Sequence, residues 1–218
     1  MCFSAPGSFI LGSALIGSGA CSVKRVKNKA FLPLALIPLF LGIQQVLEGG
    51  VWLALAAQDR FLTTLFAFGY LFFALSFGQV WIPLTVYRIE PPGWRKSLMG
   101  WFLAVGIIVF AASYFVLLFT SRSLEPTIVN HSISYNAFIT AINPRIHLAL
   151  YVLYAVLGFV PLYISSFTPL RAMALMLTVS VAVSALFYLH AFTSVWCFFA
   201  AIISFYVLRI IRAAPGNK

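Results

Sequence analysis

Charged side chains are scarce in this sequence. Only 8% of its 218 residues are Asp, Glu, Lys or Arg, whereas 62% are hydrophobic, and the mean hydropathy is +1.02. A water-soluble domain cannot bury that much apolar surface, so a soluble globular fold is excluded and a polytopic membrane protein is indicated. At this length the chain has room for one helical bundle and no separate soluble domain.

Cysteine is rare as well, and common cofactor motifs are missing. The three cysteines, Cys2, Cys21 and Cys197, are too few and too far apart to form a disulfide framework. The sequence has no P-loop, no Rossmann glycine pattern and no c-type haem motif. Every lysine lies outside the apolar segments, which excludes the Schiff-base chemistry of rhodopsins. The net charge of +10 is spread over loops rather than gathered on one face, so nucleic acid is not an expected partner.

Long apolar runs dominate instead. The hydrocarbon core of a bilayer is about 30 Å thick, and an α-helix needs roughly 20 residues to cross it. Seven segments approach or exceed this length, so we predict an all-α fold, a seven-helix transmembrane bundle forming a single domain over residues 1–218. The predicted spans are residues 6–23, 31–57, 61–87, 98–119, 146–166, 170–190 and 194–211.

Small residues modify the first two of these segments. In the first, Ser13, Gly17 and Cys21 recur every four residues, and this spacing favours close packing of their face on a neighbouring helix. In the second, the pair Gly49-Gly50 predicts a break in the helix. The third segment follows after only residues 58–60, so the second and third are expected to form a tight hairpin that tilts or projects from the membrane.

The connection 121–145 is the only long one. Side chains of its central part fall on one side at a period of two, which predicts a short strand or hairpin lying over the outer end of the bundle. These residues are His131, Ile133, Tyr135, Ala137 and Ile139.

Basic residues are distributed unevenly between the two sets of loops. Eleven of the fourteen lie in loops on one side: Lys24, Arg25, Lys27, Lys29, Arg88, Arg95, Lys96, Arg171, Arg209, Arg212 and Lys218. The opposite side has only Arg60, Arg122 and Arg145. Because basic loops stay in the cytoplasm, we predict an N-terminus outside the cell and a cytoplasmic C-terminus.

Glu48 is the one carboxylate inside an apolar run. Gln44 and Trp52 lie one turn away on the same helix face, and Gln45 lies three residues before it. A carboxylate within a membrane costs several kcal/mol unless it is paired, hydrated or protonated, so it marks a candidate functional site. The alternative is a structural role, in which Glu48 only joins two helices by hydrogen bonds.

Other unusual side chains gather on the predicted outer side. Imidazole with carboxylate, with or without thiolate, is a zinc-type ligand set, and two histidines with one carboxylate leave a position open for water. We therefore predict an outward-facing polar pocket that binds a divalent metal, zinc first, through Glu48, His147, His190 and Cys197. Expected binding residues around it are Gln44, Gln45, Trp52, Tyr151, Tyr188 and Trp196. The alternative is that these histidines contact lipid headgroups and that Cys197 is a core residue.

Cys2 adds a second chemical possibility. Removal of Met1 would give Cys2 a free α-amine beside its thiol, a pair that serves as an N-terminal nucleophile with its own base or as a metal chelator. The alternative is an inert residue in a terminus without fixed structure.

Three stretches together resemble a known family. They are Met1-Cys2-Phe3-Ser4-Ala5, the segment from Gly42 to Trp52 with Gln44-Gln45 and Glu48-Gly49-Gly50, and Ser194-Val195-Trp196-Cys197-Phe198-Phe199-Ala200-Ala201. The chain is similar from end to end to uncharacterised bacterial multi-pass membrane proteins that begin Met-Cys-Phe-Ser-Ala. The resemblance implies a bacterial cytoplasmic (inner) membrane protein and an N-terminus packed near the second and seventh helices, but no activity.

Three functions are compatible with this pattern. The first is a membrane-embedded metal-dependent hydrolase acting on a lipid, in which a metal activates water and Glu48 is a ligand or general base. The second is a transporter or sensor of a small ligand or metal ion, although the absence of internal repeats argues against transport. The third is a structural or accessory subunit. The expected partners are the lipid bilayer and a lipid or small-molecule ligand.

The charge bias makes a topological prediction. A reporter enzyme fused after Lys218 should be active only as a cytoplasmic reporter, and one inserted beside Glu125 only as an external one. Fusion activities assayed in intact cells measure this directly. The reverse pattern at both sites would overturn the assignment of an outer pocket.

Overall fold

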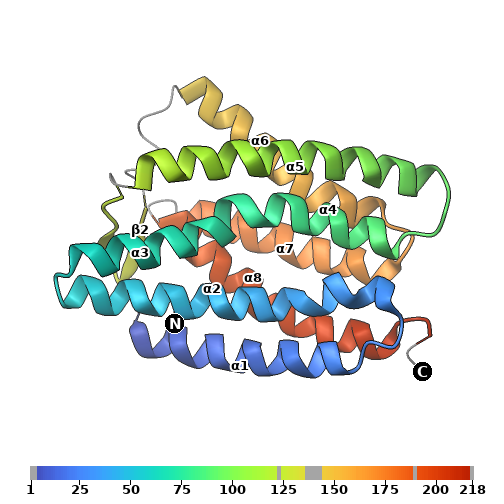
Figure 1. Ribbon diagram of the computed structural model, residues 1–218, viewed down its shortest axis with the longest axis horizontal. Coiled ribbons are helices and arrows are strands. Elements are labelled where there is room, and N and C mark those ends of the chain that lie inside the picture. Colours follow the sequence, from blue (N-terminus) through green and yellow to red (C-terminus); the bar gives the residue numbers. More distant parts are fainter. Residues whose placement is uncertain (1–3, 122–123, 136–143, 189–190, 217–218) are drawn as a thin grey trace.

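Parallel and antiparallel helices lying side by side make up nearly the whole structure, a computed structural model of the chain (Figure 1). It describes residues 4–121, 124–135, 144–188 and 191–216 and, within these ranges, every side chain except those of residues 144–151. These described residues form seven helices, of which six are long and apolar enough to cross a membrane. The chain is therefore a multi-pass membrane protein. In the remaining helix, only the apolar part Val152–Ile164 has described side chains, and this part is shorter than a membrane span.

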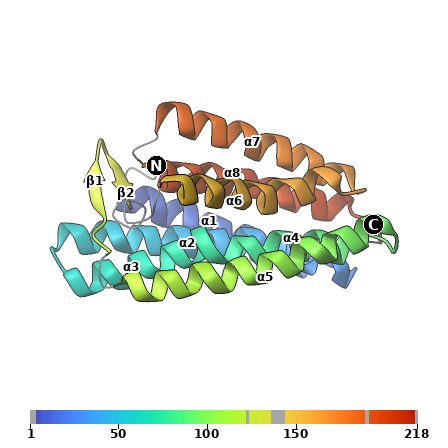
Figure 2. The same ribbon diagram turned by 90° about the horizontal axis from the view of Figure 1, so that it is seen from above.

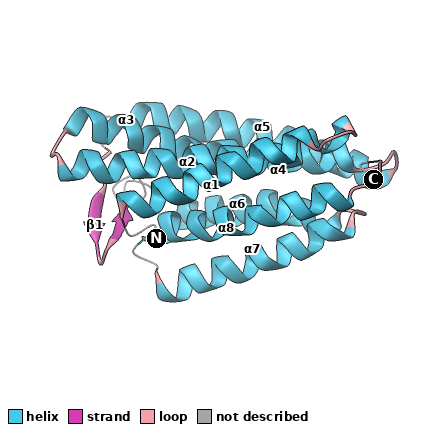
Figure 3. Cartoon of the chain, turned by 90° about the horizontal axis from the view of Figure 1, so that it is seen from below, coloured by secondary structure: helices cyan, strands magenta, loops and turns pink. Residues whose placement is uncertain are grey.

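The helices follow one another through short connections. They are α1 (Ala5–Lys24), α2 (Leu32–Ala56), α3 (Arg60–Leu71), which continues through η2 (Phe72–Phe77) into α4 (Gly78–Ile89), α5 (Trp94–Thr120), α6 (Pro144–Ile164), α7 (Thr168–Phe187) and α8 (Phe192–Ala213). A single turn, η1 (Lys29–Phe31), precedes α2. Figures 2 and 3 show α7 at one side of the bundle and α3 to α5 at the opposite side.

Polar side chains fix where several helices begin. The Ser4 hydroxyl accepts a hydrogen bond from the Gly7 N–H at the start of α1, and the Asp59 carboxylate accepts one from the Leu62 N–H at the start of α3. Each satisfies an N–H group that the first turn of a helix leaves without a partner. Gly93, with φ +148°, turns the chain between α4 and α5.

Much of the apolar surface faces outward. Along α5 only Met99, Gly106 and Leu117 are buried. Its exposed apolar side chains are Trp101, Val105, Ile107, Ile108, Phe115, Val116, Leu118 and Phe119. An apolar surface of this extent is typical of a face that meets lipid.

Close packing of α1 on α2 depends on glycines, but not on those of the predicted stripe. Ser13, Gly17 and Cys21 are exposed, so the prediction that their face packs on a neighbouring helix is wrong for this fold. The buried face carries Gly12 and Gly19. A side chain at either would collide with α2, since it would come within 2.8 Å of Val46 and 2.6 Å of the Leu39 backbone nitrogen respectively. Small residues occur on both the buried and the exposed face of α1, so a spacing of four residues could not show which face packs on α2.

The predicted break at Gly49-Gly50 is also wrong, because α2 runs unbroken from Leu32 to Ala56. A Cβ atom at Gly49 would come within 2.9 Å of the Phe9 ring, and one at Gly50 within 2.7 Å of the Phe66 ring. The two glycines therefore let aromatic rings of α1 and α3 lie directly on the α2 backbone. Their role in this fold is close approach of neighbouring helices, not flexibility.

A π-helical segment interrupts the third span. The six residues of η2, Phe72–Phe77, join α3 to α4 without ending the helix. A π turn holds one more residue than an α turn, and such segments are frequent at functional sites. Two contacts accompany it: the Ser113 hydroxyl of α5 donates to Ser76 at 3.0 Å, and Tyr154 of α6 donates to the Ala74 carbonyl at 2.7 Å.

The predicted hairpin in the long connection is confirmed. Strand β1 (Thr127–Val129) pairs antiparallel with β2 (Ser132–Ser134) at one end of the bundle (Figures 1 and 2). Ile133 and Tyr135 are buried, but Ser132 and Ser134 are buried as well and His131 is exposed in the turn, so the predicted alternation of burial is not observed. Ala137 and Ile139 lie outside the described residues.

A second buried carboxylate closes the opposite end. Glu90, 2% exposed at the end of α4, accepts hydrogen bonds from the Ser165 hydroxyl at 3.0 Å and from the Ser166 N–H at 3.1 Å. Lys96 donates to the Glu90 carbonyl, and Arg171 donates to the Ser165 carbonyl. The turn between α6 and α7 is thus fastened to α4 at the end where the basic loops lie.

The glycine packing gives a stability test within one helix. Gly19→Ala should lower the melting temperature of the detergent-purified protein, because the new Cβ atom meets the α2 backbone. Gly17→Ala should leave it unchanged or raise it, since no atom lies within 4 Å of its Cβ position and alanine favours a helix by about 1 kcal/mol. Equal melting temperatures for the two variants would show that α1 does not pack on α2 through Gly19.

Candidate functional site

Glu48 lies fully buried between α2 and α8. Its side chain is 0% exposed, and the Ser194 hydroxyl at the start of α8 donates a hydrogen bond of 2.5 Å to Glu48 Oε1. Helices α2 and α8 pack directly on each other, and α1 packs on both. The carboxylate singled out in the sequence is therefore held inside the protein and away from lipid.

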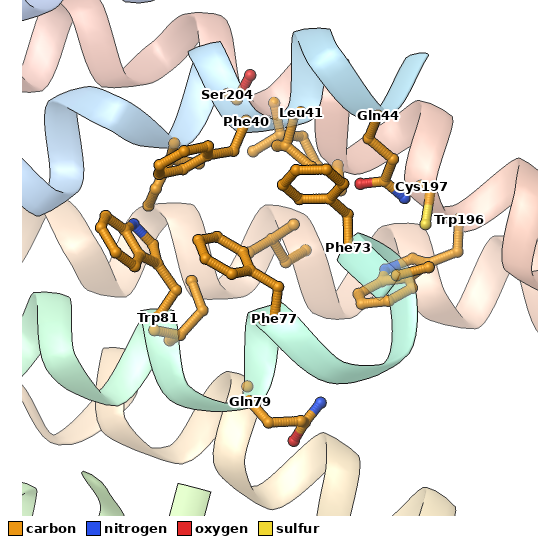
Figure 4. A pocket seen from close by; sticks show the side chains of 18 of the residues that line it. Phe40, Leu41, Gln44, Phe73, Phe77, Gln79, Trp81, Trp196, Cys197 and Ser204 are labelled. Carbon is orange, nitrogen blue, oxygen red and sulfur yellow. The ribbon is translucent and has the colours of Figure 1, made fainter. Parts of the chain in front are cut away.

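Three predicted residues surround Glu48. Gln44 and Gln45, 2% and 1% exposed, lie one turn earlier on α2, and Cys197, 4% exposed, lies one turn after Ser194 on α8. The Cys197 thiol is close enough to Glu48 and to the Gln44 amide to interact with both. Figure 4 shows the amide of Gln44 turned toward the Cys197 sulfur. One carboxylate, one thiol and the Gln44 amide thus lie together inside the bundle.

Tyr70 of α3 completes this cluster, and sequence analysis missed it. The side chain is fully buried, interacts with Cys197, and donates its hydroxyl hydrogen to the Thr193 carbonyl at 3.2 Å. Its ring stacks on Tyr135 beside the hairpin, with centroids 4.9 Å apart. A tyrosine in an apolar span has no local signal that separates it from a core aromatic residue, so only the fold reveals its place.

The other predicted site residues divide into three groups. Trp196 and Trp52 are half-buried near the cluster, each on the same helix as one of its members, and Tyr188 is half-buried at the end of α7. His147 and Tyr151 belong to α6, but their side chains lie outside the described residues. Cys2 and His190 also lie outside them.

The ligand set predicted for a metal is therefore only partly in view. Glu48 and Cys197 are both buried, on helices that pack on each other, and are close enough for an electrostatic interaction. Within the part of the chain that the structure describes, no group of three or more His, Cys, Asp or Glu side chains is placed to hold a metal ion. The metal site remains a prediction that depends on His147 and His190.

A cavity of about 120 Å³ adjoins the Glu48 cluster. Gln44 and Cys197 belong to both, while Glu48 itself does not line the cavity. The other lining residues are Ile37, Phe40, Leu41, Phe73, Ala74, Phe77, Gly78, Gln79, Trp81, Ile82, Tyr154, Gly158, Phe159, Met173, Leu177, Trp196, Ala200, Ile203 and Ser204. The predicted pocket was polar and lay between the second, fifth, sixth and seventh spans. The observed cavity is mainly apolar, and the third span contributes much of its wall.

Aromatic rings form that wall (Figure 4). Phe40 of α2 contacts Phe77 and Trp81, with centroids 4.8 and 4.9 Å away, and Phe77 stacks on Trp81 at 5.0 Å. The Trp81 indole N–H donates to the Pro33 carbonyl at 3.0 Å, which holds the ring in place. The π segment carries Phe73 and Phe77 toward the cavity.

Two hydrogen-bond donors at the Glu48 end of the cavity have no oxygen or nitrogen acceptor among the described residues. They are Gln44 Nε2 and Trp196 Nε1, both buried. The neighbouring Cys197 sulfur is only a weak acceptor. Buried N–H groups without acceptors are uncommon and costly, so this end of the cavity is suited to a ligand with an acceptor atom.

Comparisons with known proteins give a family and nothing more specific. Residues 1–218 match the model of a family described as "Family of unknown function (DUF6629)". No curated protein and no solved structure matches the chain.

The Ser194 hydrogen bond predicts a difference between two serines of α8. Ser194→Ala should lower the free energy of unfolding by about 1 kcal/mol, because Glu48 loses a donor. Ser204→Ala should change it much less, since that hydroxyl bonds only to the Ala201 carbonyl of its own helix. Thermal unfolding in detergent compares the two variants, and equal losses would argue against a special role for the Ser194 contact.

Proposed function

Because this chain belongs over its whole length to a family without an assigned function, we propose from its geometry that it is a membrane-embedded, metal-dependent hydrolase acting on a lipid. The observation that carries the proposal is the meeting of Glu48 with Cys197 inside the bundle. Both side chains belong to metal-ligating types. An ionisable group buried at membrane depth is a functional site by default, because its burial is costly.

We propose a divalent cation, zinc first, as the cofactor. Glu48 and Cys197 would supply two ligands, and His147 and His190 would complete the set. The sequence places His190 only four residues before Ser194, and α6 begins at Pro144, so His147 belongs to its first turn. Zinc sites with an open position for water are those that catalyse hydrolysis.

Such a site would hydrolyse an acyl ester. If a divalent cation were held by these residues, it would supply a more acidic and more nucleophilic water. The water oxygen adds to the ester carbonyl carbon, the bond to the alcohol oxygen breaks, and the proton lost by the water passes to the departing alcohol. Glu48 would carry this proton as general base and then acid, or would bind the cation directly.

The position of α1 supports a role for Cys2 near this site. The Phe9 ring lies against Gly49, the residue next to Glu48, so the first turns of α1 lie beside this part of α2. Cys2 is two residues before the Ser4 cap of α1. With Met1 removed, its thiol and amine would serve as a further ligand pair or as a nucleophile.

We propose that this site faces the outside of a bacterial cytoplasmic membrane. The loops rich in lysine and arginine, 24–29 and 90–96, lie at the end of the bundle away from the hairpin (Figure 1). The positive-inside rule assigns that end to the cytoplasm and the hairpin end, with Ser194 at the start of α8, to the outside.

A packing role for Glu48 is the second candidate, and the Ser194 hydrogen bond favours it. A protonated Glu48 that only joins α2 to α8 would need no metal. A transporter or sensor of a small ligand or metal ion could bind metal as well, so metal content does not distinguish it from a hydrolase. Turnover of a substrate by the purified protein does.

Glu48→Gln separates these candidates. Gln keeps the size of the side chain and an oxygen that accepts from Ser194, but it removes the charge. Bound metal should fall at least tenfold while the melting temperature changes little, because a neutral amide is a poor zinc ligand. Metal content by mass spectrometry and thermal unfolding of the detergent-purified protein measure both.

Glu90→Gln is the matched control, since Glu90 is also buried but lies at the opposite end of the bundle. It should lower stability and leave the metal in place. Cys2→Ser should reduce metal content more than Cys21→Ser, whose residue is exposed on α1. A metal-free wild type, with Glu48→Gln folded like it, would exclude the metal site and favour the packing role.

A further inference from the structure

We propose that the cavity binds one hydrocarbon chain of an acyl lipid, with the carbonyl oxygen of that lipid hydrogen-bonded to Gln44 and Trp196. This assignment rests on the proposed hydrolase, for which it names the substrate class. Binding of a lipid chain in the cavity can be measured separately from metal content.

The wall of the cavity selects a hydrocarbon chain. Away from the Glu48 end it consists mainly of aromatic and aliphatic side chains of α2, the π segment, α4, α7 and α8, with Gln79 and Ser204 as polar members. The Trp81 N–H already donates to the Pro33 carbonyl, and the Ser204 hydroxyl donates to the Ala201 carbonyl. An apolar cavity of about 150 Å³ stays dry and takes a molecule the size of benzene, so one of 120 Å³ encloses several methylene groups.

Two glycines leave room along this wall. A Cβ atom at Gly78 of α4 or at Gly158 of α6 would meet no atom within 4 Å, although both residues line the cavity. The space beside them is therefore not filled by other side chains. Because α6 belongs to a bundle surrounded by lipid, hydrocarbon chains are the molecules present at the highest concentration near this space.

The two donors select a carbonyl group. Gln44 Nε2 on α2 and Trp196 Nε1 on α8 lie at the same end of the cavity (Figure 4). A ligand of hydrocarbon alone would leave both N–H groups without acceptors, which is costly in an apolar site. A phosphate would bring charge into the same site. A carbonyl oxygen is neutral and has two lone pairs, one for each donor.

This placement puts the reacting bond beside Glu48. Gln44 lies one helical turn before Glu48 on α2, and Cys197, which follows Trp196 on α8 and lines the cavity with it, is close enough to interact with both Gln44 and Glu48. A carbonyl held by the two donors would direct its chain along the aromatic wall and its ester bond toward the carboxylate. The hydrogen bonds would also draw electron density toward the carbonyl oxygen, which favours attack by water.

Photolabelling tests the proposal on the full-length protein in lipid nanodiscs. The probes are palmitic acid with a diazirine in the middle of its chain and a phosphatidylethanolamine that carries the same chain. After irradiation, peptide mass spectrometry locates the label, and labelling of Ile107 and Ile108 on α5, which face outward, serves as the reference for bulk lipid. Excess unlabelled acid or phospholipid shows whether labelling is saturable.

We expect saturable labelling between Phe73 and Trp81 and at Phe159, with labelling of α5 unaffected by competitor. Gly158→Leu should reduce labelling in the cavity at least fivefold, because the leucine occupies the space of the chain. Gly17→Leu is the matched control: it also meets no atom, but on the exposed face of α1, and it should label like the wild type. Trp196→Phe should lower labelling about fivefold through loss of one hydrogen bond. The probe that labels saturably identifies the source of the chain.

Labelling of the cavity that is no more saturable than labelling of α5, with both probes, would overturn the proposal without reference to any variant. Unchanged labelling in folded Gly158→Leu would also overturn it, and Gly78→Leu replaces that variant if Gly158→Leu does not fold. Metal content is measured in the same samples. Saturable labelling of a metal-free wild type would contradict the metal site alone, and bound metal without cavity labelling would contradict the chain site alone.

Discussion

A carboxylate that is enclosed by two helices in an apolar medium needs hydrogen bonds from within the protein, and this requirement organises the centre of the bundle. Ser194 supplies one donor to Glu48, which fixes how α8 is rotated against α2. The same rotation brings Cys197 beside Gln44 and turns Trp196 into the cavity. Tyr70 then joins α3 to the start of α8 through the Thr193 carbonyl. Site and packing therefore share the same contacts, so substitutions that affect chemistry here are expected to affect folding as well.

Most of the helices could be read from the sequence because hydrophobic length is a local signal. The order of the helices and the hairpin after α5 follow from apolar runs and a period-two alternation. What failed was the interpretation of small residues. Gly49 and Gly50 were assigned to a break, and Ser13, Gly17 and Cys21 to a packed face, but a glycine looks the same in sequence whether it bends a helix or admits a neighbour. Only the position of Phe9, Phe66 or Leu39 decides between the two.

The site was predictable to a smaller extent. Glu48, Gln44, Gln45 and Cys197 were found because polar groups in apolar spans stand out. Tyr70 and the aromatic wall of Phe40, Phe77 and Trp81 were not found, since aromatic residues are abundant in such spans and carry no mark of what they face. The adjoining cavity was not predicted either, since polar residues in apolar spans point to the Glu48 cluster whereas most of the cavity lining is apolar. Polar residues in the apolar spans identify the end of the cavity beside Glu48, but they do not identify the aromatic side chains that line most of it.

The π segment sets the register of the third span. Each residue of an α-helix turns the chain by about 100°, so the additional residue in Phe72–Phe77 rotates all of α4 by that amount relative to α3. This rotation allows Tyr70 to face the Glu48 cluster while Trp81, farther along, faces Phe40. A chain with one residue fewer in this segment would keep its hydropathy and its number of spans, but the side chains of α4 would face in different directions. Aligning such proteins by apolar pattern alone would miss that single-residue gap and misassign every position after it in the helix.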